Sequence, residues 1–374
     1  MLYRIPDYYK EFCCVADACE ATCCAGWGIA IDPASLDRYK KVQGSFGKRL
    51  CRSVNWHTGT FHQSRDGRCA FLNEKNLCDL YIALGGESLC KTCRMYPRHV
   101  EEFENVREIT LSLSCPRVAQ ILMAKESPTV FYTLQKEGWE EYDTFDMLLY
   151  EKLCRTREVM RTMLQDRRLP VARRAVLVLG IAHDIQRRIR CNEMNACDAV
   201  LERGLTKHME KCAAERVAYF RQEKDARFRL SRSLFGGLHR METVQTDWKA
   251  GLCETEYILF VKGAAEYNHI VRKFNTWMMK HMPQWQVQCE QLIVYFMDTY
   301  YCGAVYDGRA YAKMKLAVAS TFIIEEMLRV RYCKSGGSLD EEDVVRTIYR
   351  FCREIEHSDR NLEIMENAAG ILRL

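Results

Sequence analysis

The sequence predicts a mainly α protein in which an irregular, cysteine-rich, metal-binding N-terminal domain with few short strands precedes a large helical domain. Three observations lead to this fold class. The chain has 374 residues, which is more than one domain usually contains. Eleven of its 20 cysteines lie in the first 115 residues. Long stretches with apolar residues at helical spacing begin near residue 127, so we expect a metal domain of residues 1–126 and a helical domain of residues 127–374.

The first of these domains lacks sustained helical periodicity and is interrupted by short polar and glycine-containing stretches. Apolar or aromatic runs at residues 27–31 and 106–113 predict short strands. Residues 34–42 predict a short helix that Asp32 or Ser35 caps. So little regular structure needs something besides apolar burial to hold it together.

The second domain is predicted to consist of long amphipathic helices. Proline at position 170 suits a first helical turn, and Ser338 with Glu341 fits a capping box. Residues 225–249, which include the pair Gly236-Gly237, are predicted to form a loop. The predicted helices lie near residues 129–137, 140–165, 170–190, 193–222, 254–280, 284–302, 308–331, 339–356 and 358–372.

Composition and charge exclude several classes of protein. Hydrophobic residues make up 48% and charged residues 28%, without low-complexity tracts, so a globular protein is expected. The net charge of +5 is small and spread along the chain, which argues against a nucleic-acid partner. The N-terminus has no apolar signal region, and no apolar run approaches the ~20 residues that span a bilayer. We therefore expect a cytoplasmic protein without a membrane partner.

The N-terminal cysteines point to a metal site. In a chain without an export signal, cysteines are more often metal ligands, reactive thiols or core residues than disulfides. The spacing of Cys90 and Cys93 is a weak signal alone, since it also occurs in redox motifs. Several bent cysteine segments can bring four thiolates to one soft metal. Taken together, eight cysteines favour metal binding over the alternative that they are buried apolar side chains. They are Cys19, Cys23, Cys24, Cys69, Cys78, Cys90, Cys93 and Cys115.

The cysteine spacing does not distinguish zinc from an iron-sulfur cluster, because both accept four thiolates. His57 and His62 could join a zinc site, but isolated histidines are more often solvated. The cysteine spacing of radical S-adenosylmethionine enzymes is not present, since Gly26 stands where their third cysteine would follow Cys19 and Cys23. Radical chemistry of that type is therefore not expected.

The ordered cysteine motifs resemble those of the flagellin lysine N-methylase family. They are also similar to those of zinc- or iron-chelating cysteine-cluster proteins. The match covers about a third of the chain. The residues that carry it are Phe12-x-Cys14, Cys19-x3-Cys23-Cys24-x-Gly26-Trp27, Arg68-Cys69-x-Phe71-Leu72, Cys78-x-x-Tyr81, Leu89-Cys90-x-x-Cys93-Arg94-x-Tyr96-Pro97-Arg98 and Leu111-Ser112-x-Ser114-Cys115-Pro116.

This resemblance implies N-methylation of lysine side chains on flagellin, with S-adenosylmethionine as methyl donor. It also implies a 4Fe-4S cluster, with zinc as the alternative metal. Cys13 stands outside the pattern. The metal ligands are therefore expected among Cys14, Cys19, Cys23, Cys24, Cys69, Cys78, Cys90, Cys93 and Cys115, of which about four would bind one cluster.

Methyl transfer to lysine needs a neutral amine, although a free lysine has a pKa of ~10.4. The chain has no Rossmann-type glycine motif, so a conventional methyltransferase domain is not expected. We expect the cofactor to bind beside the cluster, through an iron site not filled by cysteine, with the helical domain as the opposite wall. The sequence assigns no catalytic residue and no cofactor-binding residue.

Several other residues are given structural roles. Asp298 and Asp307 are expected to be solvated or to cap helices. The cysteines from Cys154 to Cys352 are expected to be core or surface thiols, with Cys197 and Cys212 too far apart on one predicted helix to share an ion. A set of aromatic residues could line a channel for a cationic lysine, but their helical spacing favours core packing: Tyr295, Phe296, Tyr300, Tyr301, Tyr306 and Tyr311.

Two other functions stay open from the residues alone. The cysteines could hold together a zinc-stabilised interaction module without catalytic activity. They could also hold the cluster of an iron-sulfur electron-transfer protein.

Overall fold

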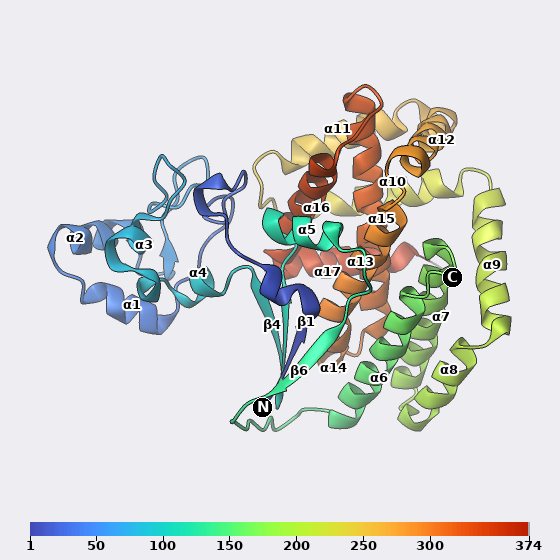
Figure 1. Ribbon diagram of the computed structural model, residues 1–374, viewed down its shortest axis with the longest axis horizontal. Helices are drawn as coiled ribbons and strands as arrows, with labels where there is room; N and C mark the ends of the chain where they lie inside the picture. Colours follow the sequence, from blue (N-terminus) through green and yellow to red (C-terminus); the bar gives the residue numbers. More distant parts are fainter. Residues whose placement is uncertain (373–374) are drawn as a thin grey trace.

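The computed structural model describes residues 1–372 and confirms a mainly α fold with few short strands (Figure 1). The strands are β1 (Leu2–Pro6), β2 (Val54–Asn55), β3 (Thr60–Phe61), β4 (Arg98–Phe103), β5 (Val106–Leu111) and β6 (Phe131–Gln135). The helices are α1 (Pro33–Lys40), α2 (Gly44–Ser53), α3 (Asp79–Leu84), α4 (Lys91–Met95), α5 (Pro116–Ala124), α6 (Met147–Leu164), α7 (Val171–Arg190), α8 (Cys197–Gly204), α9 (Lys207–Gln222), α10 (Ala226–Leu238), α11 (Trp248–Phe260), α12 (Gly263–His281), α13 (Trp285–Tyr300), α14 (Ala304–Asp307), α15 (Ala310–Lys334), α16 (Glu341–Glu356) and α17 (Asp359–Ala368).

The cysteine-rich lobe, which we define as residues 12–97, projects from the helical body and contains α1 to α4 with the hairpin β2–β3 (Figure 1). Asp32 caps α1 as predicted, because its carboxylate accepts a hydrogen bond of 3.0 Å from the backbone N–H of Ser35. The predicted strand at residues 27–31 is wrong, since Ala30 forms only an isolated bridge to Thr60. The lobe is therefore built from short elements and loops.

A four-stranded sheet joins the lobe to the helical body, in the order β4-β5-β1-β6. β5 confirms the strand expected from residue 106 onward; it pairs antiparallel with β4 and parallel with β1. β6 pairs antiparallel with β1, and Arg4 lies opposite Thr133. The helix predicted at residues 129–137 is wrong, because its aromatic and β-branched residues favour a strand once β1 offers an edge.

The buried apolar residues form two separate clusters. The smaller cluster lies within the lobe and packs Tyr39, Leu50 and Phe71 together. The larger cluster takes Tyr8 from the start of the chain and then continues from Phe103 through the helical body. The domain boundary expected at residue 126 stays a prediction. We propose that the cysteine-rich lobe forms one domain and that the sheet belongs with the helical body, because the two apolar clusters separate there.

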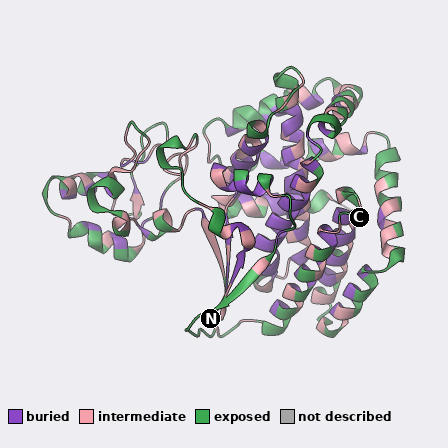
Figure 2. Ribbon diagram, viewed as in Figure 1, coloured by how far each residue is buried: buried purple, intermediate pink, exposed green. Residues whose placement is uncertain are grey.

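Two helices form the centre of the helical body. α13 is buried along almost its whole length, and α15 lies beside it, so both are largely purple in Figure 2. The predicted helices at residues 170–190, 284–302 and 339–356 are confirmed as α7, α13 and α16. Burial on all sides explains why α13 carries apolar residues around most of its circumference, whereas α7 and α16 keep a charged outer face.

A network of buried charges holds the sheet against the helices. Arg157 of α6 donates to both carboxylate oxygens of Glu108 on β5, one at 2.6 Å. Asp298 of α13 pairs with Arg4 at 2.5 Å and with Arg161 at 2.9 Å. The expectation that Asp298 is solvated or caps a helix is therefore wrong; its side chain is buried among arginines that compensate its charge.

Several long predicted helices are interrupted. α6 begins at Met147 rather than at residue 140, because Asp146 caps it by accepting from the backbone N–H of Leu149. The segment 193–222 divides into α8 and α9, where Thr206 caps the second helix. The segment 254–280 belongs to α11 and α12, which are separated just before Gly263 at φ +80°.

The loop predicted at residues 225–249 is wrong over most of its length. Helix α10 occupies residues 226–238 and includes both glycines of the Gly236-Gly237 pair. Gly237 packs directly against α17, because a Cβ atom at this position would lie 2.6 Å from the Cβ of Ala368. Glycine here permits close helix packing rather than a turn.

The C-terminal helices differ from the expected bounds only near their ends. A capping box starts α16, but Asp340 and Asp343 form it instead of Ser338 and Glu341. α15 extends to Lys334, and α17 starts after Ser358, whose hydroxyl accepts from the N–H of Asn361. Asp307 is exposed, as expected of a solvated side chain; it accepts from the backbone N–H of Arg309 at 2.8 Å and pairs with Lys313 at 2.9 Å, but it caps none of the described helices.

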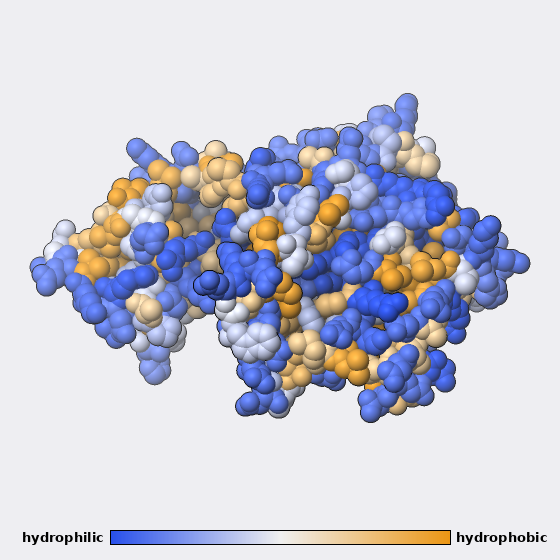
Figure 3. All heavy atoms as spheres, turned by 60° about the horizontal axis from the view of Figure 1, so that its bottom comes forward, coloured by the Kyte–Doolittle hydropathy of each residue, from blue (hydrophilic) through white to orange (hydrophobic). Residues whose placement is uncertain are grey.

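Polar side chains cover most of the surface seen in Figure 3, with small apolar patches that include parts of the cysteine-rich lobe. Within residues 1–372, no helix combines the length and the apolar character needed to cross a membrane.

Candidate metal centre and adjoining cavity

Eight of the nine predicted ligand cysteines lie in the cysteine-rich lobe, and Cys115 lies at the start of α5 on the helical body. Three of them, Cys69, Cys90 and Cys115, are buried. Cys14 is exposed, and the other five are partly buried. His57 and His62, the alternative zinc ligands, are both exposed.

Three cysteines directly precede helices. Cys78, Cys90 and Cys115 are the N-cap residues of α3, α4 and α5. Free N–H groups of a first helical turn attract negative charge. Burial raises the pKa of Cys115, and the backbone N–H groups of Val118 and Arg117 oppose that rise by donating to its sulfur. Backbone N–H groups thus offset part of the cost of burying a thiolate at these positions, although burial still raises the pKa of Cys78 and Cys115.

The first set of sulfurs, which we call the inner cysteine group, consists of Cys24, Cys69, Cys78, Cys90 and Cys93. The backbone N–H of Cys69 donates to the carbonyl of Cys24 at 2.8 Å, which joins two distant segments. Burial raises the pKa of Cys69 to about 12, and negative charge on Cys24, Cys78 and Cys90 adds to the rise. A hydrogen bond from Cys93 lowers the pKa of Cys90 to about 7. These thiols therefore lie close enough to influence one another's ionisation.

The second set, which we call the interface cysteine group, consists of Cys14, Cys19, Cys23 and Cys115. A hydrogen bond with Cys24 and burial raise the pKa of Cys23, and the charges of Cys14 and Cys115 raise it further. Burial also raises the pKa of Cys115, with smaller contributions from Cys19 and Cys14. The adjacent Cys23 and Cys24 connect this group to the inner one.

These residues suit a soft, positively charged group. Thiolates that repel one another would all be stabilised by a metal bound among them. Within residues 1–372, no three of the nine sulfurs lie within 4.8 Å of one another. A single zinc ion with Zn–S bonds of about 2.3 Å would bring its sulfurs to about 3.8 Å apart. The sulfurs would therefore have to move together to bind one zinc ion, and the residue types themselves suit zinc and an iron-sulfur cluster alike.

A cavity of about 190 Å³ lies between the lobe and the helical body. The lobe contributes Trp27, Thr92, Met95, Tyr96 and Pro97, and the rest of the wall is formed by Arg98, His99, Ser112, Tyr295, Tyr300, Glu356 and His357. The charges of Cys115 and Cys23 raise the pKa of Tyr96 after the larger effect of burial. The cavity thus adjoins the interface cysteine group.

Glu356, the last residue of α16, presents its carboxylate at this cavity. Tyr295 donates to Oε1 at 2.6 Å, and Tyr300 donates to the same oxygen at 3.3 Å. The Ser112 hydroxyl and the backbone N–H of Ser114 donate to Oε2. Burial raises the pKa of the Glu356 carboxyl, although these hydrogen bonds oppose the rise.

Three aromatic rings line the cavity where the lobe meets the helical body. The imidazole of His357 stacks on the indole of Trp27 with ring centroids 4.5 Å apart, and Tyr96 lies 5.9 Å from both rings. Burial and the charge of Arg353 lower the pKa of His357 to about 4. Its Nε2 is buried and has no hydrogen-bond partner among the described residues.

The sequence did not identify Glu356 or His357, because no motif marks the end of a helix as part of a site. Two of the six candidate channel aromatics, Tyr295 and Tyr300, do line the cavity. Phe296 and Tyr301 are core residues, as expected from their spacing. Tyr306 is exposed and stacks on Phe103 instead.

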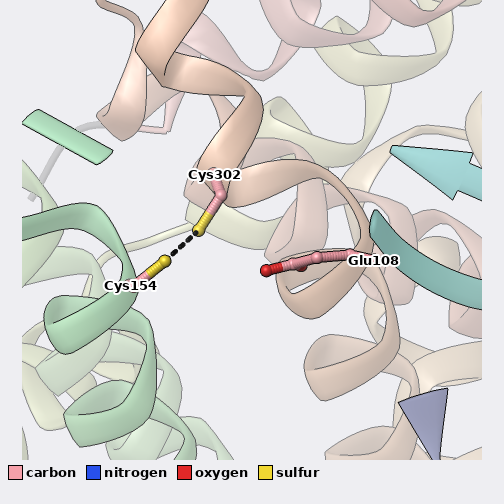
Figure 4. Close-up of side chains that lie close together, drawn as sticks. All are labelled: Glu108, Cys154 and Cys302. Carbon is pink, nitrogen blue, oxygen red and sulfur yellow. Dashed lines mark hydrogen bonds between the residues drawn. The ribbon is translucent and has the colours of Figure 1, made fainter. Parts of the chain in front are cut away.

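A separate pair of thiols lies inside the helical body. The sulfurs of Cys154 and Cys302 point toward one another at 3.8 Å, with Glu108 beside them (Figure 4). The three ligand atoms are close enough to bind an ion, but Glu108 already accepts two hydrogen bonds from Arg157. A cation would have to compete with this buried arginine, so we do not assign a metal to this pair.

The remaining cysteines fall in the core or at the surface, as expected. Cys289 and Cys352 are buried, while Cys191 and Cys333 are exposed. Cys197 belongs to α8 and Cys212 to α9, so the single helix expected to carry both is wrong.

Comparison with known proteins defines the class of the molecule. Residues 157–370, more than half of the chain, match the family model described as "FliB lysine N-methylase C-terminal domain". This part contains none of the nine predicted ligand cysteines, so it supports the family independently of their motifs. The class is that of protein-lysine N-methyltransferases. The chain belongs to the FliB lysine N-methylase family.

Three curated proteins from Salmonella are similar over a shorter segment. The chain is 29% identical over 126 residues to the flagellar biosynthetic protein FliU of Salmonella muenchen, which covers 32% of this chain and 75% of that protein. The chain is also 29% identical over 126 residues to the lysine-N-methylases of Salmonella typhimurium and Salmonella choleraesuis. These matches cover 32% of this chain and 31% of each methylase. The matched segment is thus less than a third of the length of either methylase. No solved structure matches the chain.

Proposed function

We propose that this protein transfers methyl groups from S-adenosylmethionine to lysine side chains of flagellin, and that its N-terminal cysteines hold a 4Fe-4S cluster. The observation that carries the proposal is the match of residues 157–370 to the lysine N-methylase family. The names of the similar proteins, a flagellar biosynthetic protein and two lysine-N-methylases, support flagellin as the substrate.

The cysteine groups support the metal part of the proposal. Nine thiols from distant segments gather in two connected groups, in which Cys23 forms a hydrogen bond with Cys24 and Cys90 with Cys93. When bound there, a cluster would supply iron as a Lewis acid that can hold S-adenosylmethionine. The cysteines supply the negative charge that keeps it in place. Twenty free cysteines in the described structure are consistent with a cytoplasmic location, where thiols stay reduced.

The cavity at the interface cysteine group supports a single reaction site. It lies between the lobe and the helical body, where the sequence-based hypothesis expected the cofactor. The wall contributed by α13 and α16 belongs to the matched family region, and the opposite wall belongs to the lobe. In this proposal the two parts act together, with methyl donor and lysine meeting between them.

The test is methyl transfer by protein purified without oxygen. The protein is incubated with flagellin and S-adenosylmethionine, without a reductant, and flagellin peptides are examined by mass spectrometry. We expect methylated lysines, together with iron and sulfide in the purified protein. A colourless zinc protein without activity would favour the interaction module. Cluster content without methyl transfer, but with reversible reduction, would favour an electron-transfer protein.

A further inference from the structure

Among the described residues, Glu356 has no positively charged side chain in direct contact. It accepts four hydrogen bonds but forms no ion pair with any lysine, arginine or histidine of residues 1–372. Arg98 also borders the cavity, but its Nε donates to the hydroxyl of Tyr9 at 2.8 Å. His99 lines the cavity as well, but its Nε2 lies 2.7 Å from Oε1 of Glu101 and acts on the pKa of Glu356 only through its charge, which lowers it. Neutral donors therefore orient the carboxylate, which has none of the described cationic side chains in direct contact.

The hydrogen bonds hold this carboxylate rigidly. Tyr295 is fixed from behind, because its hydroxyl accepts from the backbone N–H of Leu113 at 3.1 Å while it donates to Glu356. The Ser112 and Ser114 contacts come from the segment that leads to Cys115. Glu356 is partly exposed despite these contacts. A carboxylate fixed in this way binds a cation without first losing conformational freedom.

His357 gives a second and independent indication of a ligand. Its Nε2 is buried without a hydrogen-bond partner, although the ring lines the cavity and is held by Trp27. An unpartnered buried polar atom is unfavourable unless a bound group or water completes its contacts. Because the ring is neutral near pH 7, it does not repel a positively charged ligand.

The cavity has room for a small ligand. Its volume of about 190 Å³ is many times the ~10–15 Å³ that one water molecule needs by the same measure. The aminobutyl chain of a lysine, with an added methyl group, fits this space. The rings of Trp27, Tyr96 and Tyr300 around the cavity also suit an alkylammonium group, which aromatic faces attract.

We infer that this cavity receives the side chain of the lysine to be methylated and that Glu356 binds its ammonium group. The inference rests on the proposed function. One ammonium proton passes to the Glu356 carboxylate, which leaves a neutral amine. The amine nitrogen then forms a bond to the sulfonium methyl as the sulfur–methyl bond breaks, and that electron pair stays on sulfur as a thioether. The product is a methylammonium ion, which the wall of the cavity again accommodates.

The test compares Glu356→Gln with Glu363→Gln, since Glu363 is an exposed glutamate of α17 outside the cavity. Methylation of flagellin by Glu356→Gln should fall by about 100-fold or more in kcat, while iron content and S-adenosylmethionine binding stay unchanged. Glu363→Gln should match the original protein. A Tyr300→Phe variant, which removes one hydrogen bond to the carboxylate, should lose about 10-fold and decides the question if Glu356→Gln does not fold.

A binding probe separates this inference from the proposed function. Saturation-transfer NMR with n-butylammonium should show contact with the original protein and with Glu363→Gln. The contact should be lost with Glu356→Gln and weakened with Tyr300→Phe. If the original protein binds the probe in this way but does not methylate flagellin, the proposed function fails and the cation site stands. If it methylates flagellin and the Glu356 and Tyr300 variants keep full rate and probe contact, the inference is overturned.

Discussion

The imidazole of His357 stacks on the indole of Trp27 with centroids 4.5 Å apart and ring planes within 10° of parallel. This contact joins the end of α16 to the segment that follows Cys23 and Cys24. The indole N–H donates to the carbonyl of Cys23 at 2.8 Å, so the stacked pair is tied to the cysteine motif itself. Lobe and helical body are therefore connected at the cavity wall.

The buried imidazole should make stability depend on pH. The pKa of His357 is about 4 in the folded protein and about 6.5 in an unfolded chain. The unfolded state therefore binds the proton first as pH falls, so stability should be lost between about pH 6.5 and pH 4, by at most about 3 kcal/mol. Urea unfolding of the original protein and of His357→Phe, which keeps a stacking ring, measures this difference. A stability difference that stays constant from pH 7.5 to pH 4.5 would contradict the prediction.

Loss of a single inner cysteine should remove bound metal. Cys90 is buried, directly precedes α4 and interacts with Cys93, so Cys90→Ser should lower iron and sulfide content to less than half. Cys333→Ser changes an exposed thiol at the end of α15 and should leave both unchanged. Iron and acid-labile sulfide are measured on protein purified without oxygen. Equal metal content in the two variants would exclude Cys90 from the ligand set.

Two neighbouring glycines of α10 should respond in opposite directions. Gly237→Ala places a methyl group 2.6 Å from the Cβ of Ala368, and should destabilise the protein by about 1–3 kcal/mol. Gly236 has nothing within 4 Å of an added Cβ and is exposed, so Gly236→Ala should stabilise by about 0.5–1 kcal/mol. Urea denaturation measures both. Similar effects at the two positions would mean that α10 and α17 do not pack as described.

The buried ion pairs should matter more than those at the surface. Arg157→Met leaves Glu108 and Asp298 with less compensation in the interior and should cost about 3 kcal/mol. Arg350→Met removes a pair with Asp247 between exposed side chains and should cost less than about 1 kcal/mol. The free energies of unfolding of both variants give the comparison. An equal loss would show that the Arg157 network is open to water.

Local patterns were sufficient to predict much of this molecule. The helical spacing of α7, α13 and α16 and the capping role of Asp32 could be predicted because neighbouring residues determine them. The cysteine motifs predicted the family, which the match of the helical region confirms. Such features depend on residues that are close together in the sequence.

Other features depend on partners that are distant in the sequence. β6 is a strand because β1 pairs with it, and Gly237 lies in a helix because α17 approaches it. The cavity joins Trp27 to His357 across more than three hundred residues. No short motif contains these relationships. Glu356 and His357 could therefore be assigned to the site only from the three-dimensional structure.

The most direct measurement is a crystal structure of the protein, purified without oxygen and bound to S-adenosylhomocysteine and a lysine-containing fragment of flagellin. Iron is expected among the inner or interface cysteines, and a lysine side chain should enter the cavity with its nitrogen at hydrogen-bond distance from Glu356. A lysine bound elsewhere, with the cavity filled only by water, would contradict this expectation.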